Sequence, residues 1–273
     1  MYAKDLIFLL LIFSVTQFLG LYAASNYLNL VEAGIVQTFF ENPESASNSV
    51  IFLILILFST AIVALVLKFL RVLFKFLEAL VIFVSSSLTF DLIFLNLNFP
   101  VGIILASILT FFRFYKPSYL TLNLALIFSA AGVATIFGSS LGIIPSLLLL
   151  VFLSAYDFFS VFISKHMIYL AKEFSKEKTS FIAGRPVEFN RKISVKKTFS
   201  RLGGGDIIVP LIFSISALRS YGLFSALLSI CGSILALLLL LSFGTKKLVK
   251  PLPALPFICS GTLAGFLLSL IRF

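Results

Sequence analysis

Long runs of apolar residues, separated by short polar stretches, extend along almost the whole chain. Several runs hold about 17 or more uncharged residues, which is enough for a helix rising 1.5 Å per residue to cross ~30 Å of hydrocarbon. The runs are continuous rather than alternating, so they predict helices and not the strands of a membrane barrel. Nine spans are predicted, at approximately Leu6–Ala24, Val50–Leu67, Phe76–Leu95, Pro100–Phe114, Tyr119–Phe137, Gly142–Ser164, Ile207–Tyr221, Leu223–Phe243 and Pro253–Leu270.

Composition supports this interpretation. Of the 273 residues, 60% are hydrophobic and 12% charged, whereas soluble domains contain about 45–50% apolar and about 25% charged residues. A water-soluble globule, a disordered chain and a disulfide-stapled secreted module are therefore excluded. The predicted fold class is an all-α polytopic membrane protein. Residues 1–273 are expected to form a single membrane-embedded domain, with spans one to six over about 6–164, a polar loop over about 165–201 and spans seven to nine over about 207–270.

The net charge of +10 is explained by membrane topology rather than by nucleic-acid binding. If the nine spans alternate in direction, 19 of the 21 Lys and Arg residues fall on one face, and only Arg219 and Arg272 fall on the other. The positive-inside rule then predicts a cytoplasmic N-terminus and an external C-terminus. Ala23-Ala24-Ser25 weakly resembles a signal-peptide cleavage site, but the preceding apolar run exceeds a typical signal core. We expect a multi-pass protein of the lipid bilayer, in the plasma membrane if the source is prokaryotic.

Two loops are long. The external loop Ser25–Ser49 carries three Glu residues and apolar positions that suit the membrane interface. The internal loop Lys165–Arg201 is basic, and the simplest interpretation is a solvated linker near anionic headgroups. An added structural element near a substrate entrance is the alternative.

Acidic residues inside apolar runs are candidates for function, because a charge in hydrocarbon costs at least about 2.5–3.5 kcal/mol. Glu78 follows Lys75 closely and is expected to reach water or pair with that lysine. Asp91 lies near a span end, where helix capping or interfacial solvation accounts for it. Asp157 differs, since it lies eight residues before Lys165 and hence about 12 Å deep in its helix.

Asp206 is the fourth acid, five residues after Arg201. It follows the large cytoplasmic loop as Asp157 precedes it, so antiparallel neighbouring spans bring both to a similar depth. Two carboxyls that meet in a low dielectric cannot both ionise cheaply, so such a pair shares one proton. That arrangement suits an aspartic protease, and it equally suits an ion-binding or proton-relay pair of a transporter. The spacing of the acids does not choose between them.

Glycine and proline flank these positions. Gly203, Gly204 and Gly205 precede Asp206; they are poor helix formers, but they leave room for a substrate backbone to approach. Three prolines within Pro251–Pro256 are expected to prevent a regular helix at the start of the last span. The alternatives are close helix packing for the glycines and an ordinary proline-led helix start for the prolines.

Taken together, these motifs resemble the presenilin and signal peptide peptidase family of intramembrane aspartyl proteases. The matching residues are Tyr156-Asp157 in span six, the Gly-x-Gly-Asp sequence ending at Asp206 in span seven, and Pro253-Ala254-Leu255 in span nine. The size is similar to that of a microbial, archaeal-type homologue, and the predicted orientation resembles presenilin rather than signal peptide peptidase.

The resemblance implies roles for individual residues. It makes Asp157 and Asp206 catalytic, and gives Pro253, Ala254 and Leu255 a part in shaping the active site. It implies an orienting or substrate-contacting role for Tyr156. Gly203, Gly204 and Gly205 would lie beside the substrate, although presenilins commonly have a bulkier residue where Gly204 stands. Transmembrane peptides or proteins would be the substrates, with no cofactor and no metal.

Other chemistries have weaker support. The single histidine, His166, lies in the basic loop, and neither a zinc-protease HExxH sequence nor a rhomboid-like serine motif occurs. Prepilin peptidases share Gly-x-Gly-Asp, but Pro253-Ala254-Leu255 favours the presenilin side. Cys231 and Cys259 lack CxxC spacing and are expected to be core residues. Outside enzymes, the alternative is a proton- or cation-coupled transporter using the same acids, and a structural scaffold is the third option.

Overall fold

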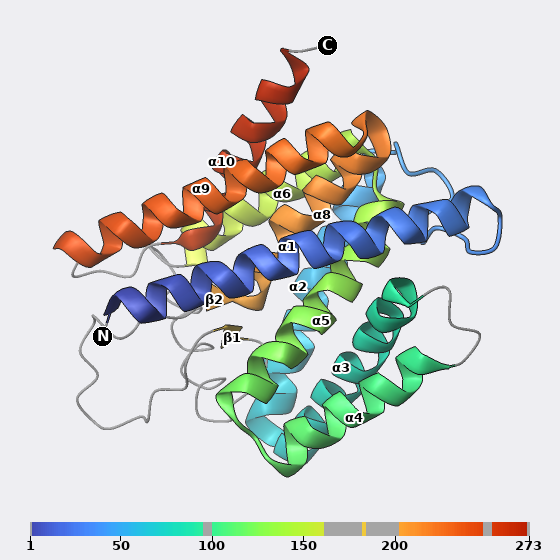
Figure 1. Ribbon diagram of the computed structural model, residues 1–273, viewed down its shortest axis with the longest axis vertical. Coiled ribbons are helices and arrows are strands. Elements are labelled where there is room, and N and C mark those ends of the chain that lie inside the picture. Colours follow the sequence, from blue (N-terminus) through green and yellow to red (C-terminus); the bar gives the residue numbers. More distant parts are fainter. Residues whose placement is uncertain (1, 95–99, 161–181, 184–201, 248–252, 272–273) are drawn as a thin grey trace.

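The computed structural model describes residues 2–94, 100–160, 182–183, 202–247 and 253–271. Within those ranges it consists of nine helices and a pair of two-residue strands (Figure 1). Each predicted span has a helix in its place, so the all-α class is confirmed. The helices are α1 (Tyr2–Glu32), α2 (Ser47–Phe69), α3 (Arg71–Ile93), α4 (Val101–Tyr115), α5 (Tyr119–Ser140), α6 (Ile143–Phe159), α8 (Gly204–Tyr221), α9 (Leu223–Lys247) and α10 (Ala254–Leu270).

The outer surface of the bundle is apolar. Large side chains on the peripheral helices are exposed, among them Phe58 of α2 at 65% and Ile103 of α4 at 52%. A soluble protein rarely exposes so much continuous apolar surface, whereas a bilayer solvates it. Among the described residues, four helices are long and apolar enough to cross a membrane by length and composition, and the chain is an integral membrane protein. Those four cover Leu6–Glu32, Val72–Ile93, Tyr119–Ser140 and Leu223–Ser242.

The first helix is longer than the sequence indicates. It continues through Ser25 to Glu32, so the expected external loop from Ser25 is wrong for its first eight residues. Packing explains the extension, because Tyr27 lies in a buried cluster with Leu92 of α3. The Asn26 side-chain amide also donates to the Leu92 carbonyl at 2.9 Å.

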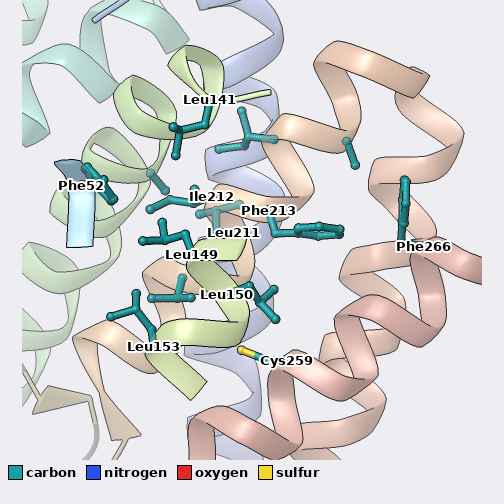
Figure 2. Close-up of a cluster of buried hydrophobic side chains, with 14 of the residues drawn as sticks. Phe52, Leu141, Leu149, Leu150, Leu153, Leu211, Ile212, Phe213, Cys259 and Phe266 are labelled. Carbon is teal, nitrogen blue, oxygen red and sulfur yellow. The ribbon is translucent and has the colours of Figure 1, made fainter. Parts of the chain in front are cut away.

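The central helix of the bundle is α8, which packs against α1, α5, α6, α9 and α10. Its buried residues point in all directions, as expected for a helix surrounded by protein. Figure 2 shows Leu211, Ile212 and Phe213 of α8 within one apolar cluster, together with side chains of α6 and Phe266 of α10. The rings of Phe213 and Phe266 meet edge to face, 5.4 Å between centroids.

The pair α3 and α4 contains a buried ion pair. Glu78, 2% exposed, accepts a hydrogen bond from the Arg113 guanidinium at 2.8 Å. Glu78 is buried, so the expectation that it reaches water is wrong. The expected partner Lys75 is exposed, and Arg113, which the sequence did not suggest, forms the ion pair. Asp91 caps a helix, as expected, and the helix it caps is α4: its Oδ1 accepts the Gly102 N–H at 2.9 Å. Both acids therefore stabilise the packing of α3 on α4.

Most of the loop 165–201, including His166, lies outside the described residues. Two of its residues form β1 (Ile182–Ala183), which pairs antiparallel with β2 (Leu202–Gly203). This ladder leads directly into α8. The loop thus contributes at least one ordered element next to the predicted site, which favours the alternative of an added structural element there.

Helices α9 and α10 pack with their backbones almost in contact. A Cβ atom added at Gly265 would lie 2.1 Å from the Leu228 carbonyl oxygen, and one at Gly232 would lie 2.1 Å from that of Gly261. Small residues at such positions let membrane helices approach closely. Any larger side chain there separates α10 from α9.

We expect Gly265→Val to destabilise the protein by about 1–3 kcal/mol, the usual cost of overpacking. Thermal unfolding in detergent should show the loss as a lower Tm. Ala264→Val is the matched control, because Ala264 is the neighbouring residue on α10 and is exposed. Equal Tm values for the two variants would contradict this account of the interface.

Candidate active site

Asp157 lies near the end of α6 and is 8% exposed. Its Oδ2 accepts a hydrogen bond from the Leu255 N–H in the first turn of α10, at 3.3 Å. The two residues are 98 positions apart in the sequence. The Tyr156-Asp157 motif of span six and the Pro253-Ala254-Leu255 motif of span nine are therefore joined by a direct hydrogen bond.

Asp206 lies in the first turn of α8. Its Oδ2 accepts the backbone N–H of Gly203, the N-cap residue, at 3.1 Å. Gly203 is extended, with φ −70° and ψ 148°, and a Cβ there would lie 3.3 Å from the same carboxylate oxygen. Gly205 is exposed, and a Cβ added to it would meet nothing within 4 Å. Gly205 thus has open space beside it, whereas Gly203 closely approaches the Asp206 carboxylate; that the glycines make room for a substrate backbone stays a prediction.

The two carboxyls face a shared region. Helices α6 and α8 pack against each other, and the carboxylates of Asp157 and Asp206 interact electrostatically. The thiol of Cys259 on α10 is near enough to interact with both. Cys259 is buried, as predicted, whereas Cys231 on α9 is exposed, contrary to prediction. In the part of the chain described, no basic side chain forms a salt bridge with either aspartate.

The proline-rich segment is more regular than expected. Pro253 is an extended N-cap, and α10 begins at Ala254, so the helix already includes Leu255 and Pro256. The prediction that the prolines prevent a helix is wrong for these residues. The reason is that N–H groups in a first turn have no partner within the helix, so a proline there removes no bond. Pro251 and Leu252 lie outside the described residues.

Tyr156 is half-buried and adjoins Asp157 on α6. Gly204 is buried at the first position of α8. The structure thus brings the predicted residues of α6, α8 and α10 to one region of the bundle. Among the described residues, no group of three or more His, Cys, Asp or Glu is placed to hold a metal ion.

A pocket of about 380 Å³ lies between α6 and α10, and its lining includes Phe158 and Pro256, the residues that follow Asp157 and Leu255 in the sequence. Its outer side chains, such as Val151 and Phe158, are 46% and 49% exposed, so it opens to the outside of the bundle. The sequence analysis did not find it, because its residues belong to ordinary apolar runs. The lining is Leu150, Val151, Ser154, Ala155, Phe158, Pro256, Cys259, Ser260 and Leu263.

This site can carry out acid–base chemistry on a bound group. Two carboxyls that interact in a low dielectric supply one proton donor and one proton acceptor. Backbone N–H groups fix one oxygen of each.

The fold of this chain is the same as that of proteins whose structures have been solved. The chain matches a presenilin family intramembrane aspartate protease in two crystal forms. The first match has a TM-score of 0.71 and 24% identity, and covers 98% of this chain and 99% of that one. The second has a TM-score of 0.70 and 24% identity, and covers 97% of each. A search of curated proteins gave no match.

A family model described as signal-peptide peptidase, presenilin aspartyl protease matches residues 9–273, nearly the entire chain. Nothing in these comparisons supports the transporter alternative. The chain belongs to the signal-peptide peptidase and presenilin family, and it is an intramembrane aspartyl protease.

Proposed function

We propose that Asp157 and Asp206 are the catalytic pair, and that they hydrolyse a peptide bond of a transmembrane substrate. The observation that carries the proposal is that two acids from separate helices interact within the bundle, each held by one backbone N–H. The pair shares one proton. The ionised carboxyl takes a proton from water as the water oxygen attacks the peptide carbonyl carbon, and the protonated carboxyl gives its proton to the carbonyl oxygen. Transfer of a proton to the amide nitrogen then lets the C–N bond break.

The neighbouring backbone supports these roles. Leu255 and Gly203 donate to Asp157 and Asp206 respectively. Such charge-assisted bonds hold each carboxyl in one orientation, which acid–base catalysis requires. Pro253 and Ala254 act by starting α10 at the position where the Leu255 N–H reaches Asp157.

The pocket between α6 and α10 favours a lateral approach by the substrate. Its lining is mainly apolar and includes Phe158, the residue after Asp157, and it opens outward, which suits side chains of a transmembrane helix. That helix must unwind locally to present an amide to the acids. The open space at Gly205 leaves room for its backbone, and Tyr156, next to Asp157, is proposed to orient it.

The orientation is proposed from charge. The face carrying 19 of the 21 basic residues is cytoplasmic, as the positive-inside rule requires. The N-terminus is then inside, the C-terminus outside and the acids nearer the cytoplasmic face. In a prokaryotic cell this membrane is the plasma membrane. The assignment of residues 1–273 to a single domain stays a prediction.

We expect Asp157→Asn and Asp206→Asn to lower the rate of cleavage of a reconstituted single-span substrate by at least about 10²–10⁴-fold, since each removes a proton-transfer group. Asn keeps an oxygen that can accept the backbone N–H, so the Tm should stay near the wild-type value. Asp91→Asn is the control, because that acid caps α4 away from the pair. Cleavage at the wild-type rate by either catalytic variant would refute the assignment.

Leu255 offers a test of the backbone donor. Leu255→Pro removes the N–H that reaches Asp157, whereas Leu255→Ala removes most of the side chain and keeps the N–H. A lost hydrogen bond to a charged group costs about 1.5–3 kcal/mol, so Leu255→Pro should cleave about 10-fold or more slowly than Leu255→Ala. The measurement is kcat on the same substrate. Equal rates for the two variants would show that the bond is not needed.

Reporter fusions test the orientation. Alkaline phosphatase folds only outside the cytoplasm, so fusion after Phe273 should be active and fusion after Lys247 inactive. The enzyme activity of intact cells is the measurement. The reverse pattern would overturn the proposed topology while leaving the chemistry of the site untouched.

A further inference from the structure

Gln17 is a buried amide that the proposed mechanism does not use. It lies in the apolar helix α1 and is 0% exposed. Its neighbour Thr16 is equally buried, but the Thr16 hydroxyl donates to Ile12 within the same helix at 2.8 Å. Gln17 instead reaches another helix: its Nε2 donates to the Ile207 carbonyl oxygen of α8 at 3.0 Å.

Stability does not account for this amide. Its Oε1 is buried and has no hydrogen-bond partner within the described part of the chain. A buried acceptor without a partner costs free energy that an apolar side chain of similar size would avoid. The useful contribution of Gln17 is therefore the single hydrogen bond that it donates. The acceptor is the carbonyl of Ile207, the residue after Asp206.

The first turn of α8, which accepts this hydrogen bond, is poorly stabilised by its own residues. Gly204 and Gly205 begin α8, and glycine is a poor helix former. Pro210 lies inside the helix and has no N–H, so it gives no helical bond to the carbonyl of Asp206, four residues earlier. The backbone on both sides of the carboxyl thus has fewer constraints than an ordinary helix supplies.

Helix α1 is well placed to supply the missing constraint. One turn beyond Gln17, Gly20 meets α8 so closely that an added Cβ would lie 2.5 Å from Leu211. One turn before it, Phe13 shares a buried cluster with Ile207. Gln17 meets Ile207 and, one turn later, Gly20 meets Leu211, so α1 and α8 run parallel, and the Gln17 bond lies next to a close contact of the two helices. The bond joins the first turn of α8 to a rigid surface.

We propose that Gln17 is a positioning residue for the hydrolysis proposed above, on which this inference rests. Its bond to Ile207 fixes the rotation of the first turn of α8. That rotation determines where the Asp206 carboxyl meets Asp157 and the substrate carbonyl. Gln17 does not touch the reacting atoms, and it acts through the backbone.

The test compares three variants in cleavage of the same reconstituted substrate. Gln17→Met keeps the length of the side chain and removes the donor, and we expect kcat to fall on the order of 10–100-fold with little change in KM, as misplacement of a catalytic group does. Thr16→Val is the matched control, because it removes a buried hydroxyl at the same depth that makes no bond to α8; its kcat should match wild type. Gln17→Glu restores an O–H donor only while its carboxyl is protonated. It should cleave faster than Gln17→Met at low pH and lose that advantage as pH rises.

Several results would overturn the proposal. These are a wild-type kcat for Gln17→Met, an equal loss for Thr16→Val, and an unchanged ratio of Gln17→Glu to Gln17→Met across the pH range. Failure of both Gln17 variants to fold would also overturn it, since Gln17 would then be a requirement of the fold rather than of the rate. If the wild-type protein itself cleaves nothing, the proposed function fails, and that outcome is distinct from all of these.

Discussion

Burying two carboxyl groups inside a lipid-embedded bundle costs free energy, and the structure of the site follows from the need to offset that cost. Each group needs hydrogen-bond donors that are not committed elsewhere. The structure supplies them from the starts of two helices, because the first N–H groups of a helix have no partner within it. Gly203, the N-cap of α8, donates to Asp206, and Leu255, in the first turn of α10, donates to Asp157. The positive ends of both helix dipoles also favour negative charge at these positions.

The need for these two N–H donors determines where α8 and α10 begin. If α10 began a turn later, the Leu255 N–H would not lie beside Asp157, and Pro253 sets the start as an extended N-cap. The other ends of these helices are held by packing: α8 is surrounded on all sides, and α10 lies against α9 through Gly261 and Gly265. The glycines that allow α10 to approach α9 and the proline that starts α10 thus both help to place the Leu255 N–H beside Asp157.

The sequence predicted the features that depend on residue type. Nine apolar runs became nine helices within the described ranges, and the acids in the apolar spans six and seven came together. The sequence could not predict bonds made by main-chain atoms: any residue but proline at 255 has the N–H that Asp157 accepts. The sequence suggested only water or the nearby Lys75 for Glu78, because Arg113 is 35 residues away along the chain and is brought to Glu78 by the packing of α3 on α4. Gln17 is a polar residue in an apolar span, a pattern that can be seen in the sequence, but its partner Ile207 is 190 residues away and cannot.

The described residues contain two arrangements of buried acid, and the difference between them agrees with the proposal that one of them is reactive. Glu78 forms an ion pair with Arg113 at 2.8 Å, so a charge of opposite sign lies directly beside it. Asp157 and Asp206 have the same sign, and the described residues place no salt-bridged cation beside them. In the proposed mechanism one proton shared by the two carboxyls relieves their mutual repulsion, and either carboxyl can hold it. Such a pair keeps an acid and a base side by side, as the proposed hydrolysis requires.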